Sequence, residues 1–269
     1  KSMSKSILKE YKEFFNRELQ RFVSDNYPGE LGEIVAYSLF TGGKRLRPIM
    51  IHSLAENFHL NEFEMIPAML GVEFIHNYSL IQDDLPPFDD DDKRRGNETV
   101  HRRYNEYSAI LASDALITDA MYLLARYNNP RIMKLTRDLI GFNGLVKGQY
   151  LDMKTFPDNF EGMNNIYYLK TGKLFELCFL IPLVISGEEY IIHDMAQIAA
   201  DFGTAFQIHN DLKPNKEEGK GILSIYDKEK ALELFKDYLQ RSKKIFDFTK
   251  FQNFYREEIE KFLAGWLVI

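Results

Sequence analysis

Apolar residues recur along most of this chain at spacings of three and four, which is the period of an α-helix with one buried face. Between residues 7 and 23 they trace a single helical face. Similar spacings predict helices at 31–40, 108–127, 132–147, 167–185 and 194–212. The segment 65–81 is apolar on nearly every side, so it predicts a helix that is buried all round. The more charged stretch 228–267 predicts a peripheral amphipathic region.

Glycine and proline residues separate these predicted helices. No Asn-Gly or Asp-Gly pair, the usual signal of a β-hairpin, lies between alternating strands. The pair Gly42-Gly43 follows the helix at 31–40 and is typical of a left-handed helix end. An α/β fold is the alternative, but it needs runs of β-branched residues that the chain lacks. No repeat, low-complexity stretch or Pro/Ser-rich linker divides the sequence. We therefore expect an all-α fold, with residues 1–269 forming one domain.

Composition narrows the class of protein. The chain is 45% hydrophobic and 28% charged, which is enough to build a core. Its net charge is −6 and it has no basic block, so nucleic acid is an unsuitable partner. The single cysteine, Cys178, excludes an intrachain disulfide and a Cys-rich metal site. The longest apolar run, 177–185, contains Pro182 and is shorter than the ~20 residues of a membrane span. A cytoplasmic protein without integral membrane association is expected.

An acidic run follows the fully apolar helix. Six aspartates stand between residues 83 and 92. They lie at the C-terminal end of a buried helix, where the helix dipole is already negative, so unpaired carboxylates there are costly. A divalent cation removes this repulsion, and carboxylate oxygens suit Mg²⁺. A solvated acidic loop is the alternative, which the preceding apolar helix and the following Arg94-Arg95 disfavour.

Three further segments contain polar or charged residues at positions that can serve binding or catalysis. The sequence G-G-K-R-L-R-P at 42–48 is not a Walker phosphate loop, but its three cations beside a flexible turn suit a diphosphate. Lys170-Thr171-Gly172-Lys173 interrupts an apolar helix and can loosen its hydrogen-bond ladder, although a packing glycine is the alternative. At 206–211 a polar pair again follows an apolar helix and can form a second face of an ion site.

Together these segments resemble the trans-isoprenyl diphosphate synthase (polyprenyl synthetase) family, most closely its bacterial farnesyl diphosphate synthase (geranyltranstransferase) type. The likeness runs from about residue 31 to 226, and the run I-H-N-Y-S-L-I-Q-D-D-L-P-P-F-D-D-D-D-K-R-R-G at 75–96 is close to diagnostic. It also includes 42–48, G-Q-Y-L-D at 148–152, K-T-G-K-L at 170–174, F-Q-I-H-N-D at 206–211 and E-G-K-G-I-L-S-I-Y at 218–226. The resemblance implies an isoprenoid-synthase helical bundle around a deep central cavity, with two acidic segments facing each other across its mouth.

The resemblance also implies a reaction and its site. Isopentenyl diphosphate is joined head to tail (1'-4) to dimethylallyl or geranyl diphosphate, with ionisation assisted by Mg²⁺, three ions in the family. The implied metal ligands are Asp83, Asp84, Asp89, Asn210 and Asp211. The implied contacts to the allylic diphosphate are Arg94 and Lys170, and those to isopentenyl diphosphate are Lys44, Arg47, His76 and Arg95. Thr171 and Gln207 are implied near the reacting carbons, and Lys220 is a further implied substrate contact.

Product length has a simple interpretation on the predicted helix. Tyr78 precedes Asp83 by five residues, which places it about 7.5 Å deeper on a nearby face. An aromatic ring there would form the bottom of the hydrocarbon pocket, as it does in farnesyl-type members of the family. Ser79 beside it has a small side chain. We therefore expect farnesyl diphosphate, a C15 product.

One segment departs from the family pattern. The second acidic motif usually reads D-D-x-x-D, whereas here the residues are Asn210-Asp211-Leu212-Lys213-Pro214, and the stretch after them is short. A non-catalytic or regulatory partner subunit of the same fold is therefore an alternative to an active enzyme. A same-fold prenyltransferase with another acceptor is a second alternative, while the intact 42–48 segment and His76 argue against a terpene cyclase. Members of the family are usually homodimers, so a homodimer is expected.

Overall fold

The computed structural model describes residues 7–213 and 221–244. Its contacts divide the chain into two compact units, residues 1–52 with 61–133 and residues 53–60 with 134–269. The all-α fold class is confirmed, since the only strands among the described residues are those of one short hairpin. A single domain over 1–269 stays a prediction.

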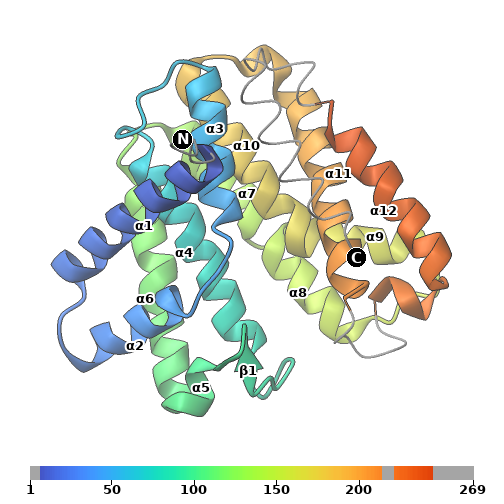
Figure 1. Ribbon diagram of the computed structural model, residues 1–269, viewed down its shortest axis with the longest axis horizontal. Helices are drawn as coiled ribbons and strands as arrows, with labels where there is room; N and C mark the ends of the chain where they lie inside the picture. The colour runs from blue at the N-terminus through green and yellow to red at the C-terminus, as the bar shows by residue number, and fades with distance from the viewer. Residues whose placement is uncertain (1–6, 214–220, 245–269) are drawn as a thin grey trace, which may run out of the picture. The chain divides into compact units, whose positions relative to one another are not determined.

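In the first unit, the central pair of helices is α4 (Ile66–Asp83) and α6 (Glu106–Ala125), which lie side by side (Figure 1). A hairpin of β1 (Lys93–Arg94) and β2 (Asn97–Glu98) follows α4. The remaining helices are α1 (Ile7–Asn26), α2 (Gly29–Phe40) and α5 (Val100–Arg103), with the larger part of α3 (Leu46–Asn57) and the start of α7 (Pro130–Ile140).

In the second unit, α11 (Ile192–Asp211) packs against both α10 (Lys173–Ser186) and α12 (Lys228–Ser242). The rings of Phe175 and Phe202 meet edge to face between α10 and α11, with centroids 4.9 Å apart. The other elements are α8 (Leu145–Lys154), α9 (Phe160–Tyr167), the π-helical turn η1 (Tyr168–Gly172), η2 (Glu189–Ile191) and η3 (Gly221–Ser224). The π turn confirms that the helix is loosened at Thr171-Gly172.

One expectation about a helix is wrong, and helix α3 was not predicted. Residues 132–147 do not form one helix, because α7 ends at Ile140 and α8 begins at Leu145. The chain turns so tightly between them that a Cβ on Gly144 would lie 1.9 Å from the Leu139 carbonyl oxygen. Helix α3 has no counterpart among the predicted helices, because residues 46–55 are all buried and show no polar face.

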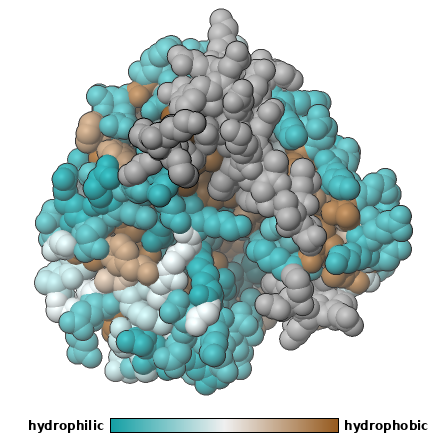
Figure 2. Space-filling model, in the orientation of Figure 1, coloured by the Kyte–Doolittle hydropathy of each residue, from teal (hydrophilic) through white to brown (hydrophobic). Residues whose placement is uncertain are grey.

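Helix α6 has two distinct faces. By length and composition alone, it is the one described helix that could cross a membrane. One of its faces is buried within the first unit through Ala109, Ala112, Leu116, Ala120 and Leu123, as in the core helix of a globular protein. Tyr107, Ile110 and Leu111 are exposed at helical spacing. Figure 2 shows a mainly hydrophilic face of the molecule with small apolar areas. Absence of a membrane span stays a prediction.

The packing of α11 against η1 depends on paired glycines. A Cβ on Gly203 would lie 2.6 Å from the Gly172 Cα, a distance that side-chain movement cannot relieve. We expect Gly203→Ala to lower the free energy of unfolding by about 1–3 kcal/mol, because the two backbones must separate. Urea unfolding measures this change, and Gly162→Ala at the start of α9 is the control, since a Cβ there meets only side-chain atoms at 3.2 Å or more. Equal stability of wild type and Gly203→Ala would contradict the close approach.

Candidate active site

The first acidic segment folds back on the end of α4. Asp83 is the last residue of α4, and its carbonyl oxygen accepts a hydrogen bond from the Asp89 N–H at 2.9 Å. The Asp91 N–H donates in the same way to the Asp84 carbonyl at 3.2 Å. Asp83 is half-buried and Asp89 is exposed. The loop therefore brings the backbone of Asp89 beside Asp83, although five residues separate them in the sequence.

Asp84 has a different environment from its neighbours. Its carboxylate is buried and accepts hydrogen bonds from Arg94 Nε at 2.9 and 3.0 Å and from Arg94 Nη2 at 2.6 Å. Burial raises the pKa of Asp84, and the Arg94 guanidinium opposes this rise. The charge-assisted pair ties the β1 strand to the end of α4. Arg94, predicted as a substrate contact, is thus also the partner of a predicted metal ligand.

The residues of this segment fit a magnesium ion. Asp83 and Asp89 offer carboxylate oxygens, which are the ligands Mg²⁺ prefers, and neither side chain is fully buried. The C-terminal end of α4 adds partial negative charge from its last carbonyl groups. A cation at this point relieves the mutual repulsion of the carboxylates and the dipole.

The glycine pair shapes the basic segment. Gly42 and Gly43 have φ angles of +100° and +134°, which L side chains rarely adopt. A Cβ on Gly43 would lie 2.7 Å from Arg95 Nη1, and the same nitrogen donates to the Gly42 carbonyl at 2.6 Å. The segment 42–48 and Arg95 therefore lie together, as expected for a shared anion site.

Arg45 does not take part in such a site. Its backbone is left-handed, with a φ angle of +55°, and its side chain is buried. Nη1 donates to Glu73 Oε1 at 2.8 Å, and Nε donates to Asn16 Oδ1 at 3.2 Å. Nη2 donates to the Leu39 carbonyl. Of the three cations in the segment, the middle one therefore stabilises the fold.

His76 lies in a strongly positive environment. Burial lowers its pKa well below the ordinary value, and the nearby charges of Arg47, Arg95, Arg94 and Arg45 lower it further. A neutral imidazole beside several guanidinium groups leaves a net positive site that favours a bound anion. His76, Arg47, Arg94 and Arg95, which the resemblance implies as substrate contacts, are thus grouped within the first unit.

The two predicted chain-length residues lie on α4. Tyr78 is half-buried, and burial raises its pKa, with the nearby Asp114 raising it further and a hydrogen bond with Gln82 opposing the rise. The Ser79 hydroxyl donates to the His76 carbonyl at 2.7 Å, so it is occupied within its own helix. A role for either residue in limiting product length stays a prediction.

In the second unit, the π turn contacts both α8 and α11, and these contacts involve three of the predicted residues. Lys170 Nζ forms an ion pair with Asp152 Oδ2 at 2.7 Å, and the Thr171 hydroxyl donates to Gln207 Oε1 at 3.0 Å. A Cβ on Gly148 would lie 2.6 Å from the Lys170 nitrogen, so α8 touches the turn directly. These contacts fix the positions of Lys170, Thr171 and Gln207 relative to one another.

The second acidic segment is already occupied by protein groups. Asn210 Oδ1 accepts from Lys213 Nζ at 2.6 Å. The buried carboxylate of Asp211 accepts from the Tyr167 hydroxyl and from the Ile222 N–H, the latter at 3.1 Å. Burial and the Asp211 carboxylate raise the pKa of Tyr167, so its hydroxyl keeps its proton. Lys220, a predicted substrate contact, lies outside the described residues.

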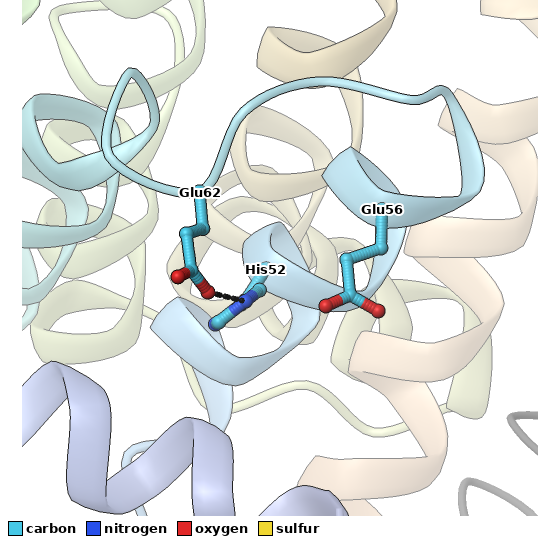
Figure 3. Close-up of side chains that lie close together, drawn as sticks. All are labelled: His52, Glu56 and Glu62. Carbon is cyan, nitrogen blue, oxygen red and sulfur yellow. Dashed lines mark ion pairs between the residues drawn. The ribbon is translucent and has the colours of Figure 1, made fainter.

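Two groups of polar residues were not singled out from the sequence. Tyr168 donates to the buried Glu176 at 2.9 Å and so links the π turn to α10, a contact that only a buried carboxylate in an apolar helix could have signalled. Figure 3 shows His52 and Glu56 on successive turns of α3, and the ion pair of His52 with Glu62 at 3.3 Å. The His52 ring stacks on Tyr11 with centroids 3.9 Å apart, as in a packed core.

Comparison with known proteins gives a consistent result. The polyprenyl synthetase family model matches residues 28–222. Farnesyl diphosphate synthase of Bacillus subtilis is 33% identical over 219 residues, which cover 77% of this chain and 74% of the relative. The large subunit 1 of a heterodimeric geranylgeranyl pyrophosphate synthase of Arabidopsis thaliana is 34% identical over 227 residues, which cover 77% of this chain and 61% of that subunit. Geranyltransferase of Helicobacter pylori, solved with magnesium and isoprenyl diphosphate, superposes with a TM-score of 0.78 at 24% identity, covering 98% of this chain and 99% of that one.

Proposed function

We propose that this chain, which belongs to the polyprenyl synthetase family and is a short-chain prenyl diphosphate synthase, uses Mg²⁺ and makes farnesyl diphosphate from isopentenyl diphosphate and an allylic diphosphate. The observation that supports this most is the folded-back loop that sets Asp89 beside Asp83 at the end of α4. Dimethylallyl and geranyl diphosphate are the proposed allylic substrates.

The proposed roles follow the chemistry of the bond that breaks. When bound, Mg²⁺ neutralises charge on the departing diphosphate. Asp83 and Asp89 would hold the ion, and Arg94 orients Asp84. Lys170 and Arg94 are the proposed contacts to the allylic diphosphate, as the resemblance implies. We propose three ions, the number that the resemblance implies.

The second substrate, isopentenyl diphosphate, is proposed to bind the basic residues of the first unit. Lys44, Arg47 and Arg95 bind the diphosphate of isopentenyl diphosphate, and neutral His76 donates a hydrogen bond to it. The bond between C1 of the allylic group and its diphosphate oxygen breaks, and C4 of isopentenyl diphosphate bonds to C1. Thr171 orients the Gln207 amide, whose oxygen faces the developing positive charge. The proton lost from C2 passes to the released diphosphate.

The relatives include both farnesyl and geranylgeranyl synthases, so product length needs its own test. We expect Tyr78→Ala to move the main product from C15 to C20 or longer, because removing the ring deepens the space available to the growing chain. Mass spectrometry of dephosphorylated products measures the distribution. Tyr190→Ala, which removes an exposed tyrosine in η2, is the matched control. An unchanged C15 product from Tyr78→Ala would show that another residue limits chain length.

A non-catalytic partner subunit is the second candidate. It is favoured by the second acidic segment, where Asn210 replaces a carboxylate and Asp211 is bound to Tyr167. Release of pyrophosphate from geranyl diphosphate and isopentenyl diphosphate, measured with Mg²⁺ and with EDTA, separates the two candidates. Mg²⁺-dependent release supports the enzyme, whereas binding of both substrates without release supports the partner subunit.

We propose a homodimer in the cytoplasm. The exposed apolar residues Tyr107, Ile110 and Leu111 on α6 are the proposed contact surface between the two copies. Sedimentation equilibrium checks the assembly, and a monomer at micromolar concentration would contradict it.

A further inference from the structure

A buried carboxylate next to the π turn η1 has no part in the proposed reaction. Glu176 on α10 is 7% exposed, and its Oε2 accepts a hydrogen bond from the Tyr168 hydroxyl at 2.9 Å. Lys173 Nζ lies 3.7 Å from the same oxygen. Burial raises the pKa of Glu176, while Lys173 and the Tyr168 hydroxyl oppose the rise. The carboxylate therefore lies between a donor from the first residue of the turn and a cation from the residue that follows it.

The backbones of Tyr168 and Lys173 close the same turn. The Lys173 N–H donates to the Tyr168 carbonyl, which is the hydrogen bond to the fifth preceding residue that defines a π-helix. Lys173 Nζ also lies 4.4 Å from the centre of the Tyr168 ring. A Cβ on Gly172 would lie 2.9 Å from Cδ2 of that ring, so the ring covers the end of the turn.

The side-chain contacts of Tyr168 depend on the register of the helix. In an α-helix, residues five and eight positions apart are rotated by about 140° and 80°, so they lie on different faces. A π turn has one residue more than an α turn, so across it these rotations fall to about 40° and 20°. Lys173 and Glu176 thus share a face with Tyr168 only in the π register. Their contacts with Tyr168 stabilise this register against the α register.

The register also sets the directions of two proposed site residues. Lys170 and Thr171 both lie inside η1. Lys170 pairs with Asp152 on α8 at 2.7 Å. The Thr171 hydroxyl donates to Gln207 on α11 at 3.0 Å. Loss of the extra residue from the turn would rotate the chain on one side of it by about 100° relative to the other, which would redirect both side chains.

We propose that Tyr168 and Glu176, together with Lys173, are positioning residues that hold η1 in its π register and so keep Lys170 and Thr171 in place for the allylic substrate. This proposal rests on the proposed function. The three residues act through Lys170 and Thr171 and need no contact with a substrate. A misplacement of about 1 Å in groups that orient a substrate is enough to lower the rate strongly.

Tyr168→Phe tests the proposal, because it removes the hydroxyl and keeps the ring. Hydrogen exchange followed by NMR on the ¹⁵N-labelled full chain measures opening of the Lys173 amide, which closes the turn. We expect its exchange to become about tenfold faster, as for the loss of one hydrogen bond to a charged acceptor, with the amides of α12 unchanged. Faster exchange to the same extent in α12 would indicate general destabilisation and overturn the proposal, as would an unchanged Lys173 amide.

Steady-state kinetics give a second measurement. We expect Tyr168→Phe to lower kcat about tenfold and to raise the KM for geranyl diphosphate, while the KM for isopentenyl diphosphate stays unchanged because its proposed contacts belong to the first unit. A smaller amount of folded protein would lower kcat without changing either KM. Wild-type values of kcat and of the KM for geranyl diphosphate in Tyr168→Phe would overturn the proposal.

Two further variants complete the experiment. Glu176→Gln keeps an acceptor for Tyr168 but loses the charge that attracts Lys173, so we expect changes in the same direction of about threefold, and wild-type exchange there would contradict the role of Glu176. Tyr190→Phe removes the hydroxyl of an exposed tyrosine in η2 and is the matched control. Circular dichroism verifies that each variant is folded. If the wild-type chain forms no prenyl product, the proposed function fails, whereas the exchange measurement still decides whether these residues hold the π register.

Discussion

Asp83→Asn is expected to reduce the rate of prenyl product formation at least about 10³-fold, the largest effect on activity of any single substitution in this chain. The carboxylate at the end of α4 is proposed to hold the Mg²⁺ that stabilises the departing diphosphate, and removing such electrostatic stabilisation costs on this scale. Steady-state kinetics with geranyl and isopentenyl diphosphates give the ratio of kcat values.

The same substitution should leave the fold intact. A negative charge at the C-terminal end of a helix is unfavourable by about 0.3–1 kcal/mol, so Asp83→Asn in metal-free buffer is expected not to lower the melting temperature. Asp25→Asn, an exposed carboxylate in α1, is the matched control and should change neither activity nor melting. Wild-type activity in Asp83→Asn would remove the first acidic segment from the mechanism.

Arg45→Met is expected to lower the free energy of unfolding by about 3–5 kcal/mol, the largest effect on stability. The side chains of Arg45 and Glu73 are only 4% and 3% exposed, and they pair at 2.8 Å. Losing the guanidinium leaves the Glu73 carboxylate buried without its cation, and this uncompensated charge dominates the cost. Chemical denaturation monitored by circular dichroism measures the change.

A double-mutant cycle isolates the pair. Arg45→Met combined with Glu73→Met removes both charges, so the double variant should be more stable than the sum of the two single effects predicts. Lys134→Met breaks an exposed pair with Asp138 of similar length, 2.6 Å, and should change stability little. Additive effects of Arg45→Met and Glu73→Met would show that the two side chains do not stabilise the fold as a pair.

Much of the first unit was predictable because its signals are local. The apolar helix and the aspartates after it are consecutive in the sequence, and α4 ends at Asp83, two residues beyond the predicted end. The left-handed glycines at 42 and 43 were predictable for the same reason. The role of Arg45 was not, since Lys44, Arg45 and Arg47 look equivalent in sequence. A left-handed backbone at Arg45, which no residue type there signals, accompanies its buried side chain.

The contacts of the second unit depend on residues far apart in sequence. Tyr167 and Asp211 are 44 positions apart, and neither has a neighbour that signals their hydrogen bond. The break between α7 and α8 also escaped prediction, because periodicity continues through Gly141 and Gly144 while the backbone does not. A loosened helix at 170–173 was predictable because Thr171-Gly172 is a poor helical pair in an apolar stretch, but its π-helical form was not predicted.

The most direct test of the account follows carbon from one substrate into the product. The purified chain is incubated with geranyl diphosphate and ¹³C-labelled isopentenyl diphosphate, with Mg²⁺ or with EDTA, and the products are analysed by mass spectrometry. The account predicts a C15 diphosphate that carries one labelled unit and appears only with Mg²⁺. Unlabelled geraniol, or labelled product formed equally well in EDTA, would contradict it.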